Sequence, residues 1–295
     1  MPSFEDFKPF IVTGLALGGV YALSGVGMVV LYRATGVLNL AFGAVGAMGA
    51  LIAWQLINHN GWPQGLAYVI CVLFGGVVTL IYGLVFGPPL AGREPLVKAV
   101  ATLGLALLLL GAMSLIWSDK ARSMVLPTSE HGFTVSGILV NYTQVIGLAV
   151  GVVVTASTWA FLRFTNLGTA MRALANDREI TATLGVPVRR VEAAAWLGCG
   201  LLSGISGLLL SNLVGLDATT LTFLVISALA ATLIARLQSI VLTFVAALVV
   251  GLVDALITPI LSISQYRDMT PFVLATIALL VLSGTHRTSF AGRAG

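Results

Sequence analysis

The chain has 295 residues, of which 58% are hydrophobic and 9% are charged, and its formal net charge is +4. About a quarter of the residues in a soluble domain are charged, so this composition excludes a soluble protein and indicates an integral membrane protein. A basic excess in such a chain reflects the orientation of its loops, and we therefore expect no nucleic-acid partner.

Repeated apolar runs of about twenty residues predict an all-α, polytopic transmembrane bundle, because each run can cross about 30 Å of hydrocarbon as a helix. We expect a single transmembrane domain over residues 1–295, with eight to nine spans. The first run is expected to stay in the protein, since Glu5, Asp6 and Lys8 lead directly into a full-length span. The candidate spans are residues 9–31, 35–57, 65–87, 97–117, 141–163, 191–212, 220–235, 239–258 and 270–284.

Glycines recur at three- and four-residue intervals in several spans, as in Gly14 and Gly18 or Gly200 and Gly204. This spacing lets helix backbones approach closely. We therefore interpret these glycines as packing positions rather than as groups that contact a substrate.

The second candidate span is interrupted by glycines and is compatible with a partly re-entrant segment. Asn39 is the clearest uncharged polar residue beside this interruption. Unwound backbone there would expose amide groups that can bind a small zwitterion, as half-helix ends do in transporters. An interhelical hydrogen bond is an equally open interpretation of Asn39.

Residues 166–192 form a polar segment in an otherwise apolar chain. Met171, Leu174 and Ala175 have the spacing of one helical face, and Thr169 can cap the start of that turn. The pattern predicts a short amphipathic helix outside the membrane, whose apolar face can lie in a groove of another protein.

A second short helix is predicted directly after the first. Asn176 and Glu179 have the spacing of a capping box, and Ile180 and Leu184 share one helical face. Gly185 supplies a stop. The polar segment therefore predicts two capped helices in a cytoplasmic coupling loop at about residues 165–190.

Apart from Glu192, at the very start of the span 191–212, Asp254 is the only carboxylate that these boundaries place within a span. A buried carboxylate is costly, so one interpretation is a polar contact in a translocation path or a partner for an arginine. The other is that Asp254 reaches water at the outer end of its helix, about one turn before Pro259.

The sequence contains no pattern typical of a catalytic, metal or nucleotide site. Cys71 and Cys199 lie inside apolar runs, where small hydrophobic side chains are expected, and the three histidines have no ligand spacing. No His or Cys lies beside an activating partner, and no carboxylate pair has a spacing that would place both at one intramembrane site, so we expect movement of a solute rather than its conversion. We expect no cofactor on this chain.

The basic residues predict an orientation. If residues 166–192 lie in the cytoplasm, alternating spans place eleven basic residues inside and four outside, as the positive-inside rule requires. The N-terminus is then outside and the C-terminus is cytoplasmic. The inner set is Arg33, Arg93, Lys98, Arg163, Arg172, Arg178, Arg189, Arg190, Arg236, Arg287 and Arg293, and the outer set is Lys8, Lys120, Arg122 and Arg267.

Four stretches, taken in order, carry a resemblance. They are Gly14 to Leu23 followed by Gly36 to Ala50; the polar segment with Gly168, Arg172, Ala173, Ala175, Asp177, Ala182 and Gly185; Gly251 to Leu256; and Gln265 to Met269. On these the chain resembles the integral-membrane permeases of ABC importers of the high-affinity branched-chain amino-acid class. The polar segment looks like that family's loop that docks on the ATPase subunit.

The chain departs from the family pattern in two places, of which the first bears on the substrate and the second alters a cytoplasmic turn. Phe42 and Ala44 stand where the family usually has a polar His or Gln and then an acidic residue, which makes the path more apolar. Leu233 to Ser239 replaces a Gly-Gly-x-Gly-Ser loop. Phe42 thus joins Asn39 and Asp254 as a candidate path residue.

The resemblance implies a permease subunit that imports a branched-chain amino acid or a related amino-acid or carboxylate compound by alternating access. It implies a location in the bacterial inner membrane, in contact with membrane lipid. It also implies three kinds of partner: a second related permease in a heterodimer, two ATPases that bind ATP and Mg, and an extracytoplasmic solute-binding protein. Two alternatives stay open at this point. An ion-coupled secondary transporter would work without an ATPase, and a membrane scaffold would use the polar segment only for docking.

Overall fold

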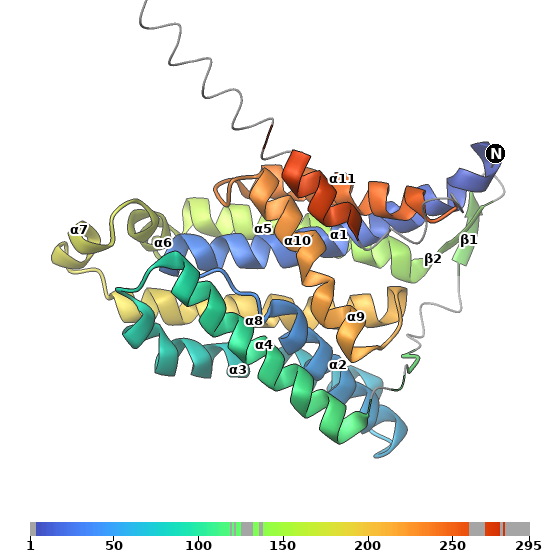
Figure 1. Cartoon of the computed structure of the whole chain (residues 1–295), viewed down its shortest axis with the longest axis horizontal. Coiled ribbons are helices and arrows are strands. Elements are labelled where there is room, and N and C mark those ends of the chain that lie inside the picture. The colour runs from blue at the N-terminus through green and yellow to red at the C-terminus, as the bar shows by residue number, and fades with distance from the viewer. Residues whose placement is uncertain are drawn as a thin grey trace, which may run out of the picture.

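The computed structural model describes residues 4–118, 120, 122–124, 132–135, 138–259, 269–277 and 280. These residues form a bundle in which some helices run nearly parallel and others cross them obliquely, with a small hairpin at one end (Figure 1). The long helices are α1 (Phe4–Thr35), α3 (Gln64–Leu90), α4 (Pro95–Trp117), α5 (Tyr142–Phe164), α8 (Val188–Leu213) and α11 (Ile240–Ile257). The shorter helices are α2 (Phe42–Asn58), α6 (Asn166–Asn176), α7 (Arg178–Thr183), α9 (Ala218–Phe223) and α10 (Val225–Ile234).

Helix α1 lies at the centre of the bundle. In its most apolar stretch 89% of the residues are buried by the rest of the chain, against 28%, 17% and 22% in α3, α4 and α5. A helix that is apolar all round has to be covered by protein or by lipid. Helix α1 is therefore the core of the bundle, and α3, α4 and α5 leave apolar surface for lipid or a partner subunit.

Glycine allows the helices to cross at backbone distance. A Cβ atom at Gly18 would stand 2.7 Å from the Cα of Leu248 in α11, and one at Gly204 would stand 2.6 Å from the Cα of Val72 in α3. Both distances are too short for any side chain, so only glycine permits these two crossings. The packing role expected for the repeated glycines is confirmed at these positions.

Two membrane segments are interrupted, and they meet inside the bundle. Helix α1 ends before Gly36, whose φ is +67°, and residues 36–41 are non-helical before α2 begins. Leu224 separates α9 from α10 in the second segment. The two segments touch, because a Cβ atom at Gly43 would lie 2.9 Å from the carbonyl oxygen of Leu221.

The expected all-α polytopic fold is confirmed. Within the described residues, six helices are long and apolar enough to cross a membrane, and α2 and the α9–α10 pair are shorter apolar helices. These shorter helices occupy the second and seventh candidate spans, where the interruptions shorten them. Of the last candidate span, residues 270–284, only residues 270–277 and 280 are described, and they are helical.

The two ends of the bundle differ. Helices α6 and α7 extend beyond one end, and the antiparallel hairpin of β1 (Gly132–Val135) and β2 (Ile138–Asn141) lies at the other (Figure 1). The turn between α10 and α11 lies at the α6 end and is tight, with Arg236 and Leu237 at φ values of 53° and 56°. This tight turn matches the short gap between the candidate spans 220–235 and 239–258.

Candidate functional site

Asn39 lies in the non-helical segment between α1 and α2 and is almost completely buried. Its side-chain oxygen accepts a hydrogen bond from the backbone N–H of Ala41 at 3.1 Å. Its side-chain nitrogen donates to the Sγ atom of Cys199 in α8 at 3.5 Å. Inside a membrane, backbone that leaves the helix needs such partners, so Asn39 stabilises the interruption from within. The interhelical contact that the sequence left open is present.

A threonine in α4 holds the same segment from the other side. The Thr102 hydroxyl accepts from the backbone N–H of Leu40 at 3.1 Å and lies 2.9 Å from the carbonyl oxygen of Leu38, to which it can donate. Lys98, one turn earlier, donates from Nζ to the carbonyl oxygen of Thr35 at 3.4 Å. The interruption is therefore a fixed feature of the bundle, held between α4 and α8.

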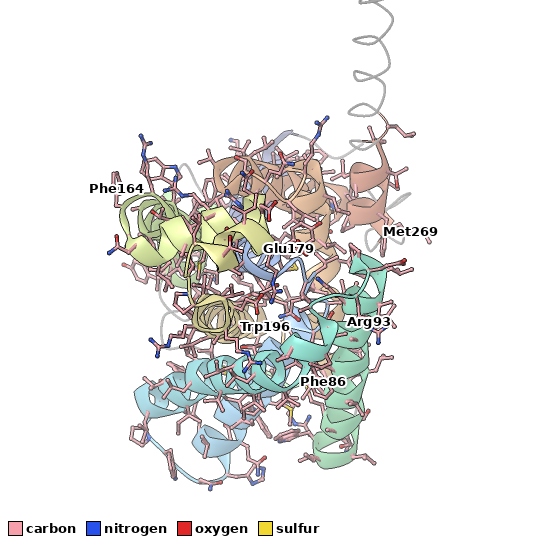
Figure 2. All side chains as sticks on the ribbon, turned by 90° about the vertical axis from the view of Figure 1, so that its left-hand side faces the viewer. Phe86, Arg93, Phe164, Glu179, Trp196 and Met269 are labelled. Atoms are coloured by element: carbon pink, nitrogen blue, oxygen red, sulfur yellow. The ribbon has the colours of Figure 1, made fainter. Side chains whose placement is uncertain are left out.

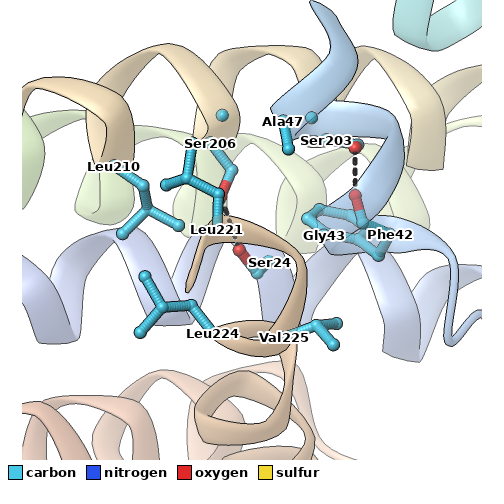
Figure 3. Close-up of a pocket in the computed structure, with 12 residues that line it drawn as sticks. Ser24, Phe42, Gly43, Ala47, Ser203, Ser206, Leu210, Leu221, Leu224 and Val225 are labelled. Carbon is cyan, nitrogen blue, oxygen red and sulfur yellow. Dashed lines mark hydrogen bonds between the residues drawn. The ribbon is translucent and has the colours of Figure 1, made fainter. Parts of the chain in front are cut away.

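A small cavity lies where the two interrupted segments meet α1 and α8 (Figure 3). Ser24 and Ser206 lie in its wall with their hydroxyl oxygens 2.7 Å apart, and the Ser203 hydroxyl donates to the carbonyl oxygen of Phe42 at 2.6 Å. The other lining residues are small or apolar, and they are Gly43, Gly46, Ala47, Gly207, Leu210, Leu221, Leu224 and Val225.

The chemistry of this cavity is neutral. It offers serine hydroxyls, the first turn of α2 and an apolar wall, and none of the residues lining it is charged. Its volume is about 10 Å³, which is close to the space that one water molecule needs. The described conformation is therefore closed at this level, and a solute could enter only after the helices around it move.

Asp254 lines a different and larger cavity. It is 5% exposed, and Oδ2 accepts a hydrogen bond from the hydroxyl of Tyr21 in α1 at 3.3 Å. The cavity has a volume of about 440 Å³ and carries further hydroxyl groups from Thr219, Thr220 and Ser227. The carboxylate is therefore covered by the bundle and faces a cavity lined by both hydroxyl and apolar side chains.

The three predicted path residues do not share one site. Phe42 lines the small cavity, Asp254 lines the larger one, and Asn39 lines neither. Leu224, at the break between α9 and α10, lines both cavities. The interrupted segment thus separates the carboxylate from the serine hydroxyls.

Helix α6 turns its apolar face toward its own chain. Met171 and Leu174 are 3% and 6% exposed and pack in one cluster with residues of α1, α5 and α8. The prediction that these two side chains meet a partner protein is therefore wrong, and the reason is that the bundle itself covers them. Ala175 is exposed, and so is Arg172, whose Nη2 donates to Thr169 at 3.3 Å.

Helix α7 is held at both ends and exposes the apolar face that α6 does not. The Asp177 side chain accepts from the N–H of Ile180 at 2.9 Å, and Gly185 ends the segment with a φ of +82°. Ile180 and Leu184 are 60% and 77% exposed. The second predicted helix and its glycine stop are confirmed, and α7 is the half of the pair with apolar side chains free for a partner.

The capping residues differ from the predicted ones. Thr165, not Thr169, caps α6, because its hydroxyl accepts from the N–H of Gly168 at 3.0 Å. Asp177, not Asn176, caps α7, and Asn176 is the last residue of α6. Both helices begin earlier or later than expected because several adjacent residues can serve as caps, and the chain direction at each turn selects among them.

The serines around the small cavity and Thr102 were not identified from the sequence. Ser203 and Ser206 follow one another at helical spacing on the face of α8 that also carries Gly200, Gly204 and Gly207. A polar pair on a glycine-rich helical face is the signal that could have found them. Ser24 and Thr102 have no such signal, because single hydroxyl residues are common in membrane helices.

Comparison with known proteins places this arrangement in a family. The sequence pattern described as "Branched-chain amino acid transport system / permease component" matches residues 10–282, which is nearly the whole chain. The match includes both interrupted segments and the α6–α7 pair.

Individual relatives show a more varied picture. The chain is 26% identical to the high-affinity branched-chain amino acid transport system permease protein BraD of Pseudomonas aeruginosa, over 71% of this chain and 72% of that protein. It is also 26% identical to LivH of Escherichia coli K12, which carries the same description, over 70% and 71% of the two chains. The fructose import permease protein FruG of Bifidobacterium longum is 24% identical over 59% of this chain and 52% of its own length.

Proposed function

This chain belongs to the family of permease components of branched-chain amino acid transport systems, and from this we propose that it is the membrane subunit of an ATP-driven importer for a small organic solute. The solute class is a branched-chain amino acid or a related amino-acid or carboxylate compound, the class named for BraD and LivH. The protein is a multi-pass membrane protein, for which we propose a location in a bacterial inner membrane.

The observation that carries this proposal is the exposed apolar face of α7. Ile180 and Leu184 are exposed on a short helix that extends beyond the end of the bundle (Figure 1). Exposed apolar side chains on an ordered, capped helix are typical of a surface that another protein covers. An ATPase subunit is the partner that the importer class implies for this surface.

The anchoring of α6 supports a mechanical link between that partner and the bundle. Met171 and Leu174 fix α6 against helices that include the central α1. A partner that binds α7 would therefore move α6 and α7 together with the helices against which α6 packs. Movement of α6 and α7 would therefore be transmitted to α1, whose residue Ser24 lines the closed cavity.

The interrupted segments support a path between the two cavities. Leu224 stands between the space that contains Asp254 and the space that contains Ser24 and Ser206. We propose that rotation at the α9–α10 break opens this connection, so that a solute passes from the carboxylate to the serine hydroxyls. A zwitterion would meet an acceptor for its ammonium group first and hydroxyl donors for its carboxylate next.

The remaining subunits follow from the importer class. We propose a second related permease, two ATPases that bind ATP and Mg, and an extracytoplasmic solute-binding protein. The α6–α7 end then faces the cytoplasm and the β1–β2 hairpin faces the binding protein. The FruG relative shows that a name in this group can specify a sugar, so the solute is best identified by ligand screening of the binding protein.

The test is reconstitution of the permease with its ATPases in lipid vesicles. The proposal predicts that the ATPases co-purify with the permease and that ATP drives uptake of solute delivered by the binding protein. A permease that transports without any ATPase, driven by an ion gradient, would contradict the proposal in favour of a secondary transporter. Stable binding of the ATPases without any solute movement would favour the scaffold.

Asp254 provides a test of the path within this complex. Asp254→Asn keeps the size of the side chain and removes its charge, so we expect normal insertion and ATPase binding with uptake reduced about tenfold or more, the effect of losing one charged contact of about 1.5–3 kcal/mol. Asp217→Asn is the matched control, because Asp217 caps α9 through the N–H of Thr220 and asparagine caps equally well. Equal uptake by Asp254→Asn and the wild type would remove this carboxylate from the path.

A further inference from the structure

A cavity of about 460 Å³ lies at the α6 end of the bundle, beside the last turn of α5 and the first turn of α11. Three arginines from three helices line it, namely Arg33 of α1, Arg163 of α5 and Arg172 of α6. Gln238 and Ser239 add polar groups, and Trp159, Leu162, Ile240 and Val241 complete the wall. The cavity wall therefore combines three cationic side chains with an apolar part formed by Trp159, Leu162, Ile240 and Val241.

The three arginines have no counter-charge within the described part of the chain. None of the residues lining the cavity is acidic. Arg33 uses its Nη1 to donate to the carbonyl oxygen of Gln238 at 3.3 Å, and the charges of Arg33 and Arg172 are close enough to repel each other. Like charges held together by the fold are stabilised when an anion enters between them.

A neighbouring cavity extends the cationic region. It has a volume of about 780 Å³ and shares Arg33, Arg172 and Gln238 with the first. Lys98, Arg178 and Arg236 line the remainder, and none of its lining residues is acidic, although Arg178 is paired with Glu192 just outside it. Only the first cavity is lined by residues of α5 and by the apolar start of α11, so only this cavity has these two apolar membrane-spanning helices beside its arginines.

The first cavity has the surroundings of a membrane–water interface. The guanidinium of Arg163 lies 5.1 Å from the ring centre of Trp159 and 5.8 Å from that of Phe164, the last residue of α5. Figure 2 shows Phe164 at the outer edge of the bundle, whereas Trp196 lies between helices. Exposed tryptophan beside arginine at the end of a span is typical of the headgroup level of a bilayer.

Further along the two membrane-spanning helices beside the cavity, apolar side chains are exposed and can be covered by lipid tails. Val241 and Val245 of α11 are 55% and 50% exposed, and Val152 and Val153 of α5 are 47% and 61% exposed. Both helices are apolar enough to span the membrane. An amphipathic ligand could thus place a negative group among the arginines and an acyl chain along α5 or α11.

We propose that this cavity, between α1, α5, α6 and α11, is a binding site for the headgroup of an anionic phospholipid. The phosphate would lie between Arg33, Arg163 and Arg172, and the acyl chains would lie along the exposed valines of α5 and α11. Basic pockets between membrane helices bind anionic headgroups in this way. The headgroup would join α6 to the bundle through charge, in addition to the apolar contacts of Met171 and Leu174.

A phospholipid fits the observations better than a free anion or an acidic protein segment. A free phosphate would bind the arginines but would leave the apolar part of the cavity wall without a contact. An acidic segment of a partner would approach from the projecting α7, whereas this cavity opens beside two membrane-spanning helices with exposed apolar side chains. The proposal concerns this chain alone, so its failure would leave the importer assignment unaffected.

The test uses the full chain reconstituted in phosphatidylcholine vesicles that contain either brominated phosphatidylglycerol or brominated phosphatidylcholine. Bromine quenches tryptophan fluorescence at short range, and the part lost in Trp159→Phe identifies the signal from the cavity. We expect brominated phosphatidylglycerol to quench Trp159 at a much lower mole fraction than brominated phosphatidylcholine. Equal quenching by the two lipids would overturn the proposal.

Arginine variants locate the selectivity. Each basic residue near an anionic surface contributes about 1 kcal/mol, so Arg163→Gln should lower the preference for phosphatidylglycerol roughly fivefold, and Arg33→Gln with Arg163→Gln roughly thirtyfold. Arg163 is exposed, so its replacement should leave the fold intact. Arg190→Gln is the matched control, because Arg190 is exposed near the same end and lines neither cavity. The same loss in Arg190→Gln would mean a diffuse surface attraction and would overturn the site, as would complete displacement of the lipid by inorganic phosphate.

Discussion

Helices α6 and α7 are adjacent, short and capped, and both carry apolar residues at helical spacing. In the structure, α6 buries Met171 and Leu174 against its own bundle, whereas α7 leaves Ile180 and Leu184 exposed. The difference teaches that amphipathic spacing identifies a surface to be covered and does not say by what. One helix of the pair is an anchor, and the other is the surface that remains for a partner.

The largest expected effect is the loss of the anchor. Leu174→Asp removes a buried leucine and places an unpaired charge in the cluster, which should destabilise the docking of α6 by at least about 3 kcal/mol. The expected result is a lower melting temperature of the purified protein and strong maleimide labelling of a cysteine placed at Met171. The control is Ala175→Asp, at the next and exposed position, which should change neither quantity. An unchanged melting temperature in Leu174→Asp would show that α6 is not anchored.

The second effect concerns the exposed surface of α7. Burial of one leucine in a partner groove contributes about 1.5–3 kcal/mol, so Leu184→Asp should weaken binding of the ATPase by roughly tenfold to a hundredfold. The melting temperature should stay that of the wild type, in contrast to Leu174→Asp. Leu184→Met keeps the surface apolar and should retain binding. If pull-down against a tagged ATPase gives equal affinity for the wild type, Leu184→Asp and Leu184→Met, then α7 is not the docking surface.

A smaller effect is expected at the cap of α7. Asp177→Ala leaves the N–H of Ile180 without its acceptor, which costs about 1 kcal/mol of helix stability and should weaken ATPase binding roughly fivefold. Asp177→Asn can accept the same hydrogen bond and should bind normally. Thr165→Ala removes the cap of α6 but leaves its anchor in place, so binding should change less. A larger loss of binding in Thr165→Ala than in Asp177→Ala would contradict the division between anchor and docking helix.

The smallest effect is expected at the ion pair between α7 and α8. Arg178 Nε lies 3.0 Å from Glu192 Oε1, with the side chains 48% and 17% exposed. A partly exposed pair of this kind contributes about 1 kcal/mol or less and weakens with salt. Arg178→Gln should therefore lower ATPase binding by less than about fivefold, and the difference from the wild type should shrink at high salt. The double variant Arg178→Glu with Glu192→Arg exchanges the two charges and should restore part of the lost ATPase binding.

Much of the fold was predictable, because membrane insertion is decided locally. Each long apolar run satisfies its own backbone hydrogen bonds as a helix, so composition and run length indicate α1, α3, α4, α5, α8 and α11 without knowledge of their neighbours. The interruption after Gly36 and the stop at Gly185 were also readable, since both glycines have a positive φ that other residues adopt at a cost. The family resemblance rested on the same segments.

The candidate site was predictable only in part. Asn39 stood out because polar residues are rare in an apolar run, but its partner Cys199 is 160 residues away in the chain. The serines of the small cavity acquire their meaning from the way α1, α2 and α8 meet. No local pattern specifies that Ser24 and Ser206 lie 2.7 Å apart.

The sequence by itself determined that this protein is a helical membrane protein of the permease family, with an interrupted second span and a capped helix pair outside the spans. Those properties depend on interactions between residues close together in the chain. Only the tertiary structure decided which apolar faces are already covered, which cavity each polar residue faces, and that three arginines from α1, α5 and α6 surround one space. Burial and charge crowding depend on contacts between distant segments, because the free energy of a side chain depends on what finally surrounds it.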